Sequence, residues 1–283
     1  MLGINSTGKD NKKHYLLGRG CIYIGEINPN TGLPDQGFRN LGHASEITMT
    51  PEINEVEHVN LCVGNGDVDE IFVTRRRFNL AFTLEEISHD NKALWSFGTV
   101  ESVPNPAVAG IPARVHGKAV KGRSYQIQTA TGVRAFDLAD ATDVTVVFDP
   151  SGVNTTLVLG TDYEVDLVRG TVFILANSPG VTSDGDKDLE ITLAASATSA
   201  ASVQRVLAVS DEIKDYAVWI KGLNGKNGEV YDLDIFSVRL KPAGSTSYIN
   251  LDTQTTLQFE GVAQVNALVP GSSKVFTISK AAG

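Results

Sequence analysis

The feature that most constrains this chain is a two-residue alternation of apolar and polar side chains over two long segments. Between residues 46 and 54 the apolar side chains fall on one side of an extended backbone and the polar ones on the other. The same alternation returns between residues 72 and 86. The intervening stretch contains Gly64-Asn65-Gly66-Asp67, which is typical of a turn. The two segments therefore predict one very long β-hairpin over residues 41–86.

The outer part of this hairpin carries charges of both signs. Its alternation sends Arg76 to the side of Phe78 and Leu80, where a lone cation is costly unless it is paired or reaches water. The carboxylate partner of Arg76 can come from the glutamates on the opposing strand of the same hairpin or from those of a neighbouring copy. A hairpin this long cannot bury itself on one small domain, so we expect these charges to form ion pairs between subunits. A nucleic-acid contact is the weaker alternative, because no aromatic residues are interleaved with the arginines. The predicted interface residues are Glu52, Glu55, Glu57, Arg75, Arg76 and Arg77.

Shorter runs with the same period predict more strands, and one segment predicts a helix. Ser88 is a good N-cap, and Gly98 is placed to end a helix of about three turns. Residues 99–116 are rich in proline and glycine and are predicted to form a loop. The chain is therefore predicted to be mainly β, in an α+β fold. The further strands are expected at 143–149, 156–166, 171–176, 188–193, 203–209, 217–221, 230–241, 255–262 and 274–278.

A change of pattern in the middle of the chain predicts two domains. Residues 117–202 form a β-rich stretch that ends in a run of small residues, which is a linker or a strand edge. We expect an inserted β-rich module over 117–202, and a core built from 1–116 together with 203–283.

Composition excludes several classes of protein. Lys and Arg number 24 against 33 Asp and Glu, which gives a net charge of −9 and argues against a general DNA clamp. Two cysteines are too few for a disulfide framework or a zinc site. No apolar run approaches the ~20 residues that span a bilayer, and the N-terminal residues lack the apolar stretch of a secretory signal. The sequence thus predicts no membrane association.

No motif predicts catalysis or a cofactor. Gly18-x-Gly20 lacks the third glycine of a dinucleotide-binding turn, and Cys62 and His58 would lie roughly 13 Å apart on a strand. Asp184, Asp186 and Asp188 could offer oxygen ligands to calcium, although the spacing is not that of a calcium-binding loop and a solvated turn is the simpler interpretation. We therefore expect no enzyme activity, no cofactor and no metal.

Several of these segments resemble the tail tube (major tail) proteins of long-tailed bacteriophages. The likeness covers most of the chain and rests on strand and helix patterns, without catalytic residues. The middle stretch resembles insertions found in some of these phage proteins. The segments that carry the likeness are Gly20–Gly25, Asn40–His43, Ile47–Glu52, Arg77–Leu84, Ser88–Gly98, Gly160–Asp166, Gly170–Val172, Val218–Gly222, Ile235–Gly244 and Thr256–Gly261.

The resemblance implies a specific architecture and role. Two antiparallel sheets would pack against each other with a short helix beside them, and six copies would form a ring whose strands close into a barrel. Rings would stack into the virion tail tube, assembled in the host bacterial cytoplasm, with the tape measure, terminator and distal tail proteins as partners. Genomic DNA would pass through the lumen without specific binding, and an acidic lumen would let it slide.

Other interpretations of the sequence remain. A β-sandwich module that binds glycans or mediates adhesion predicts a monomer with glycan affinity. A tail terminator or a secretion-system tube protein would share the tube fold. An enzyme is the weakest alternative, because no group of residues supplies its chemistry.

Overall fold

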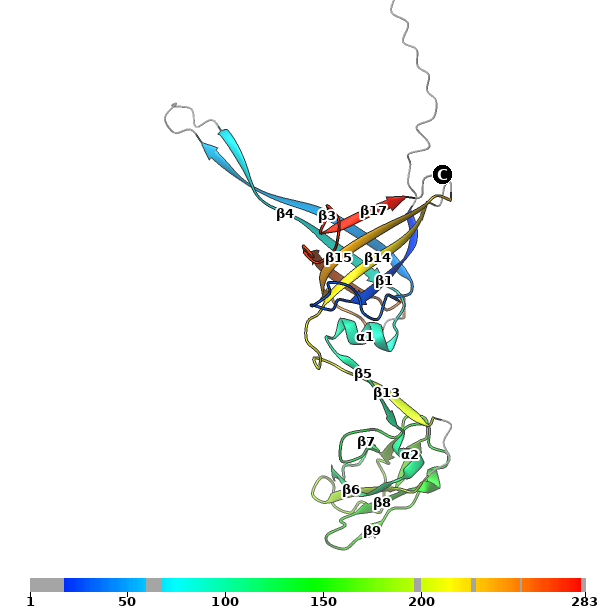
Figure 1. Ribbon diagram of the computed structural model, residues 1–283. Coiled ribbons are helices and arrows are strands. Elements are labelled where there is room, and N and C mark those ends of the chain that lie inside the picture. The colour runs from blue at the N-terminus through cyan, green and yellow to red at the C-terminus, as the bar shows by residue number, and fades with distance from the viewer. Residues whose placement is uncertain (1–17, 60–67, 196–199, 225–227, 250, 281–283) are drawn as a thin grey trace, which may run out of the picture. The chain divides into compact units, whose positions relative to one another are not determined.

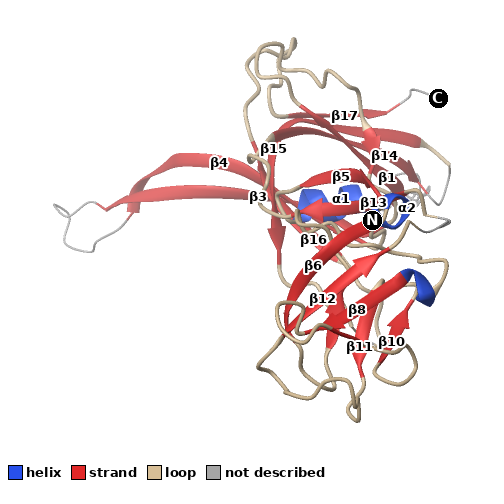
Figure 2. Cartoon of the chain, turned by 90° about the horizontal axis from the view of Figure 1, so that it is seen from below, coloured by secondary structure: helices blue, strands red, loops and turns tan. Residues whose placement is uncertain are grey.

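The computed structural model describes residues 18–59, 68–195, 200–224, 228–249 and 251–280 (Figure 1). Strand accounts for 51% and helix for 6%, so the predicted mainly-β class is confirmed. Nearly all the regular elements drawn in Figure 2 are strands. The described part of the chain holds no helix with the length and apolar character needed to span a bilayer.

The chain forms two compact units. Unit 1 comprises the residues up to Val100 and those from Val206 onward, and unit 2 comprises Glu101–Arg205. The predicted module, 117–202, therefore starts too late. The Pro- and Gly-rich stretch 99–116, predicted to be a loop, contains two strands and a short helix.

Unit 1 is built around a single antiparallel sheet of eight strands in the order β2-β1-β14-β15-β16-β4-β3, with β17 also paired to β15. Its elements are β1 (Gly18–Glu26), β2 (Arg39–Asn40), β3 (Ala44–Val59), β4 (Val68–Leu84), α1 (His89–Trp95), β14 (Asp215–Asn224), β15 (Val230–Ala243), β16 (Leu257–Ala263) and β17 (Phe276–Lys280).

Two separate sheets were expected in this part of the chain, but its strands form one sheet. The reason is that β15 is long enough to pair with two strands along the same edge. Its second half, from Val238 onward, pairs with β16. Its first half, up to Ile235, pairs with β17. Hydrogen bonding therefore continues from β1 through to β3, and the strands expected in two sheets line one core.

The core of unit 1 is made by the alternating apolar side chains of this sheet. Phe82 and Phe259, on paired strands, stack with ring centroids 5.1 Å apart. Phe78 of β4 meets Phe276 of β17 edge-on at 4.9 Å. Each such pair is worth about 0.5–1.5 kcal/mol beyond the area it buries.

Helix α1 lies against β16 and begins where the sequence predicts. The Asn91 backbone N–H donates to Ser88 Oγ at 3.1 Å, as expected of an N-cap. The helix ends at Trp95, before the predicted Gly98. A Cβ on Gly98 would lie only 2.1 Å from the Leu207 carbonyl oxygen, so a close backbone approach requires the glycine.

Unit 2 has a core of its own. A sheet in the order β6-β12-β8-β9 and a sheet in the order β10-β11-β7 both contribute to one apolar cluster. The predicted strand over 156–166 is two strands separated by a turn, in which Asp162 accepts a hydrogen bond from the Val158 N–H at 2.8 Å. The elements are α2 (Pro106–Ala109), β6 (Ile111–Lys118), β7 (Ser124–Gln126), η2 (Ala141–Asp143), β8 (Val144–Phe148), β9 (Thr155–Thr156), β10 (Tyr163–Asp166), β11 (Thr171–Ile174) and β12 (Asp188–Leu193).

Two paired strands carry the chain between the units: β5 (Thr99–Pro104) and β13 (Ser202–Leu207). Within unit 2 the buried Asn105 fixes their ends. Its Nδ2 donates to the carbonyl oxygens of Phe136 and Ala200 at 2.7 and 2.8 Å, and its Oδ1 accepts from the Phe136 and Ala107 N–H groups. The hydrogen bonds of the Asn105 side chain thus join the segment that enters unit 2 to the segment that leaves it.

Candidate functional site: the arm of β3 and β4

The predicted hairpin exists, and its outer half leaves the sheet. β16 pairs with β4 between Phe78 and Leu84, and beyond that point β3 and β4 pair, among the described residues, only with each other. Residues 52–59 and 68–77 make up this outer part, which we call the arm. Figures 1 and 2 show the arm extending away from the rest of the sheet of unit 1.

The register of the arm shows which side chains share a face. Ile53 lies opposite Arg76, and the faces alternate along β3 from there outward, whereas β4 carries one extra residue, Thr74. Register shifts occur between Ala44 and Glu46, between Asn54 and Glu55, and between His58 and Val59. At the middle shift the Thr74 hydroxyl donates to the Asn54 carbonyl oxygen at 3.0 Å, which holds a β-bulge in place.

An ion pair within the chain closes the base of the arm. Arg77 donates to both carboxylate oxygens of Glu52, at 2.7 and 2.6 Å, and Asn79 donates to one of them at 3.0 Å. The hydrogen bonds from Asn79 and Arg77 lower the pKa of the Glu52 carboxyl. Glu52 is therefore paired with the opposing strand of its own hairpin, and its predicted place at a subunit interface stays a prediction.

Arg76 lies on the side of the strand that was predicted, but it is exposed. The core ends at Phe78, so the Arg76 guanidinium reaches water, and no ion pair joins it to another residue in the described ranges. Arg75, Glu55 and Glu57 are exposed as well. Their predicted role at a subunit interface stays a prediction.

The arm also exposes large apolar side chains, which the alternation of the sequence did not distinguish from core residues. Ile53 is 55% exposed and Val73 53%. A two-stranded ribbon is only marginally stable in water, and its free edges can pair with other chains. An arm with this much uncovered apolar surface is typical of an interaction site. The exposed apolar residues of the arm are Ile53, Val56, Val68, Ile71, Phe72 and Val73.

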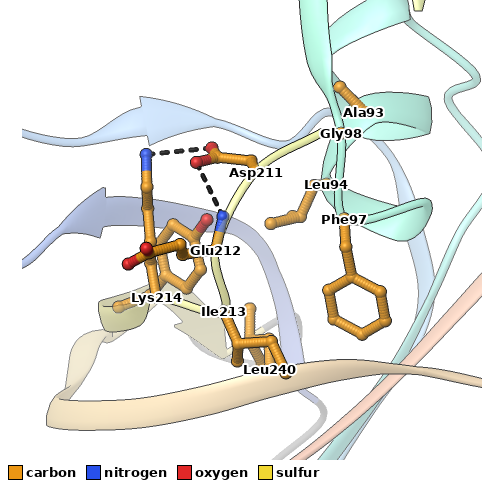
Figure 3. A pocket seen from close by; sticks show the side chains of 10 residues that line it. Ala93, Leu94, Phe97, Gly98, Asp211, Glu212, Ile213, Lys214 and Leu240 are labelled. Carbon is orange, nitrogen blue, oxygen red and sulfur yellow. Dashed lines mark hydrogen bonds and ion pairs between the residues drawn. The ribbon is translucent and has the colours of Figure 1, made fainter. Parts of the chain in front are cut away.

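A small hollow lies beside α1 and is lined by Leu94, Phe97 and Lys214 among others (Figure 3). Its volume of about 20 Å³ leaves room for roughly one water molecule. The Lys214 ammonium group at its rim pairs with Asp211 at 3.0 Å and with Glu26 at 3.1 Å. Hydrogen bonding to Asp211 raises the pKa of Lys214, so this amine is held charged and is a poor nucleophile.

A wider hollow on unit 1 is lined by Phe38, Arg39, Asp90 and Tyr216 among others. The Arg39 guanidinium donates to Asn91 Oδ1 at 2.9 Å, and burial lowers the pKa of Arg39. Among the described residues this hollow brings no hydroxyl or thiol nucleophile next to a histidine base. Neither hollow thus offers an arrangement for covalent catalysis.

Two of the three aspartates that could offer oxygen ligands to calcium instead contact neighbouring residues of unit 2. Asp184 accepts a hydrogen bond from the Lys121 N–H at 2.8 Å, and Asp188 pairs with Lys118 at 2.8 Å. Within the part of the chain that the structure describes, no group of three or more His, Cys, Asp or Glu side chains could hold a metal ion.

One family model matches residues 15–268, and its description is "Protein of unknown function UCP028589". No curated protein sequence matches the chain. The arm lies within the matched range.

Proposed function

The chain belongs to the family described as Protein of unknown function UCP028589, and we propose that it is a structural subunit of a bacteriophage tail tube. In this proposal copies of the chain form hexameric rings, and the rings stack around a lumen through which the genome passes. The single observation that carries it is the arm, which exposes apolar side chains and unpaired strand edges beyond the core.

Three other features support the proposal. The sheet of unit 1 ends in β3 on one side and in β2 on the other, so both edges can accept strands from neighbouring copies. The likeness of the late strands to tail tube proteins falls on β14, β15 and β16, which form the middle of that sheet. The net charge of −9 suits a conduit that repels DNA phosphate.

The remaining parts of the proposal follow from this role. The protein would be located in the virion tail, with the tape measure, terminator and distal tail proteins at its ends and no membrane contact. Unit 2 would be an inserted module that decorates the subunit. The acidic lumen would contact DNA without reading its sequence.

Electron microscopy and sedimentation of the purified protein at rising concentration test this proposal. We expect rings or stacked rods of the wild-type chain. Replacing residues 53–76 by Asn-Gly keeps the pair of Glu52 and Arg77 at the base and removes the arm. That variant should stay a folded monomer, because its apolar contact surface is gone.

Two matched double variants test whether assembly depends on the apolar residues of the arm or on exposed apolar residues in general. Ile71→Ser with Val73→Ser removes two exposed apolar residues from the arm, and Val153→Ser with Val168→Ser removes two from unit 2. The first pair should abolish assembly and the second should leave it intact. A wild-type chain that stays monomeric at every concentration would refute the tube, and glycan affinity in that monomer would support an adhesion module instead.

A further inference from the structure

The outer face of the sheet in unit 1 carries an unusual set of side chains. Tyr23, Trp219 and Asp234 lie side by side across β1, β14 and β15, and Lys221 and Asp232 lie in the next row. These residues alternate with the core residues of the same strands, so they point away from the core. We call this set the receptor face.

The receptor face is aromatic and carries two carboxylates against one ammonium group. The rings of Tyr23 and Trp219 lie 5.1 Å apart, and the Lys221 ammonium lies 5.9 Å from the centroid of the Trp219 ring. Asp232 Oδ1 is covered and has no hydrogen-bond donor among the described residues. Burial, and then the charge of Asp232, raise the pKa of the Asp234 carboxyl.

Asp232 and Asp234 lie two residues apart on the same face of β15, so their carboxylates repel each other, and a cation placed beside them relieves that repulsion. Arginine fits such a site best, because its planar guanidinium binds carboxylates and also stacks on aromatic rings. The site therefore favours a guanidinium from a partner.

The arm of this same chain presents a matching surface on the face that continues the core side of β3 and β4. Three cross-strand pairs lie on it: Ile53 with Arg76, Glu55 with Val73, and Glu57 with Ile71. Arg76 complements Asp232 and Asp234, the glutamates complement Lys221, and the aliphatic side chains complement Trp219 and Tyr23. The arm leads away from its own sheet, so a second copy is the occupant that this match requires (Figure 1).

We propose that the arm of one copy docks on the receptor face of the next copy, with Arg76 placed over Asp232, Asp234 and Trp219. This inference rests on the proposed function and names the contact that joins the copies. The contact is head-to-tail, since two different surfaces meet, and such contacts build closed rings or open stacks.

A charge swap tests the pairing. Arg76→Glu and Asp234→Arg should each raise the concentration for half-assembly by about tenfold or more, and the double variant should recover most of the loss. Arg76→Gln and Arg75→Gln form a matched pair, because their side chains lie one residue apart on opposite faces of the arm. Only Arg76→Gln should weaken assembly.

Disulfide cross-linking locates the contact independently. Cys21 is exposed and lies opposite Lys221, beside the receptor face. With Cys62 replaced by serine, Ile53→Cys should give covalent oligomers with the native Cys21 under mild oxidation. Asn54→Cys, on the opposite face of the arm, should give none.

The possible results distinguish a failure of the proposed contact from a failure of the proposed tail tube. The proposed contact is wrong if Arg76→Glu assembles normally. It is also wrong if the double variant recovers no assembly and Ile53→Cys forms no disulfide with Cys21. Either result leaves the proposed tail tube intact. A wild-type chain that never assembles overturns both. Circular dichroism tests whether each variant is folded. If a charge variant is unfolded, the cross-linking of Ile53→Cys to Cys21 decides whether the proposed contact exists.

Discussion

The two units should unfold independently, and this is the prediction that the fold supports most directly. The apolar cluster of unit 1 and that of unit 2 have no residue in common. We therefore expect residues 101–205, expressed alone, to fold with the same core. Likewise, Val100 joined to Val206 by a short Gly-Ser linker should leave unit 1 folded, because β5 and β13 are paired and their ends lie about one strand spacing apart.

The magnitude follows from the size of each unit. Unit 2 has roughly 100 residues, so its unfolding enthalpy should be about 70 kcal/mol near 60 °C. Differential scanning calorimetry of the full chain should show this transition as a separate component, and the isolated unit should keep its midpoint within about 2 °C. Dilute, unassembled protein is needed, since assembly raises the apparent stability of unit 1.

Two results would refute this reasoning. Isolated 101–205 could show no cooperative transition, or the midpoint could drop by more than about 10 °C. Either result would mean that unit 2 depends on unit 1 for stability. In contrast, a shortened chain that still assembles would show that unit 2 is not needed for the tube.

Two more predictions concern single side chains. Asn105→Ala removes four hydrogen bonds at the entrance to unit 2 and leaves the carbonyl groups of Phe136 and Ala200 without these donors. The substitution should lower the free energy of unfolding of unit 2 by about 2 kcal/mol. Calorimetry should show the unfolding midpoint of unit 2 lowered by roughly 10 °C. Asp234→Asn should stabilise the dilute monomer at pH 7 while weakening assembly. The folded state raises the Asp234 pKa, so the charged carboxylate destabilises the fold above a pH of about 4 and not below it. Urea unfolding at pH 7 and pH 3 should show the gain only at pH 7, and a loss at pH 7 would contradict this account.

The sequence predicts the hairpin and the helix cap well, and for a physical reason. Both signals are local: the apolar period of β3 and β4 reports which face is buried, and Ser88 bonds a backbone group three residues away. The partner of each strand is not local information. One sheet in place of two, with β15 paired to both β16 and β17, could not be obtained from alternation alone.

The segment 99–116 shows how proline and glycine can mislead. Pro106 occupies the first turn of α2, where its missing N–H costs nothing, and Gly110 follows the helix with a φ of 79°. Pro112 lies in β6, an edge strand that tolerates a missing donor. These residues are compatible with regular structure at the positions they occupy, so the boundary of unit 2 was predicted too late.

The candidate site was predicted in part. The charges of the arm are evident from the sequence, but Glu52 is engaged by Arg77 of its own chain, which only the register between β3 and β4 shows. Asp232 and Asp234 look like ordinary solvent-facing residues of a long strand. Their role in the proposed contact depends on Trp219 in the neighbouring strand, and no local pattern reports that neighbour.

The bulges of the arm bear on whether its exposed strands can form amyloid. A long flat ribbon rich in valine, isoleucine and phenylalanine is a template for cross-β stacking, in which identical strands add without limit. The inserted Thr74 and the register shifts on both sides of it bend and twist the ribbon, so straight copies cannot stack in register along it. The arm can therefore expose apolar side chains without offering a flat edge on which identical copies add.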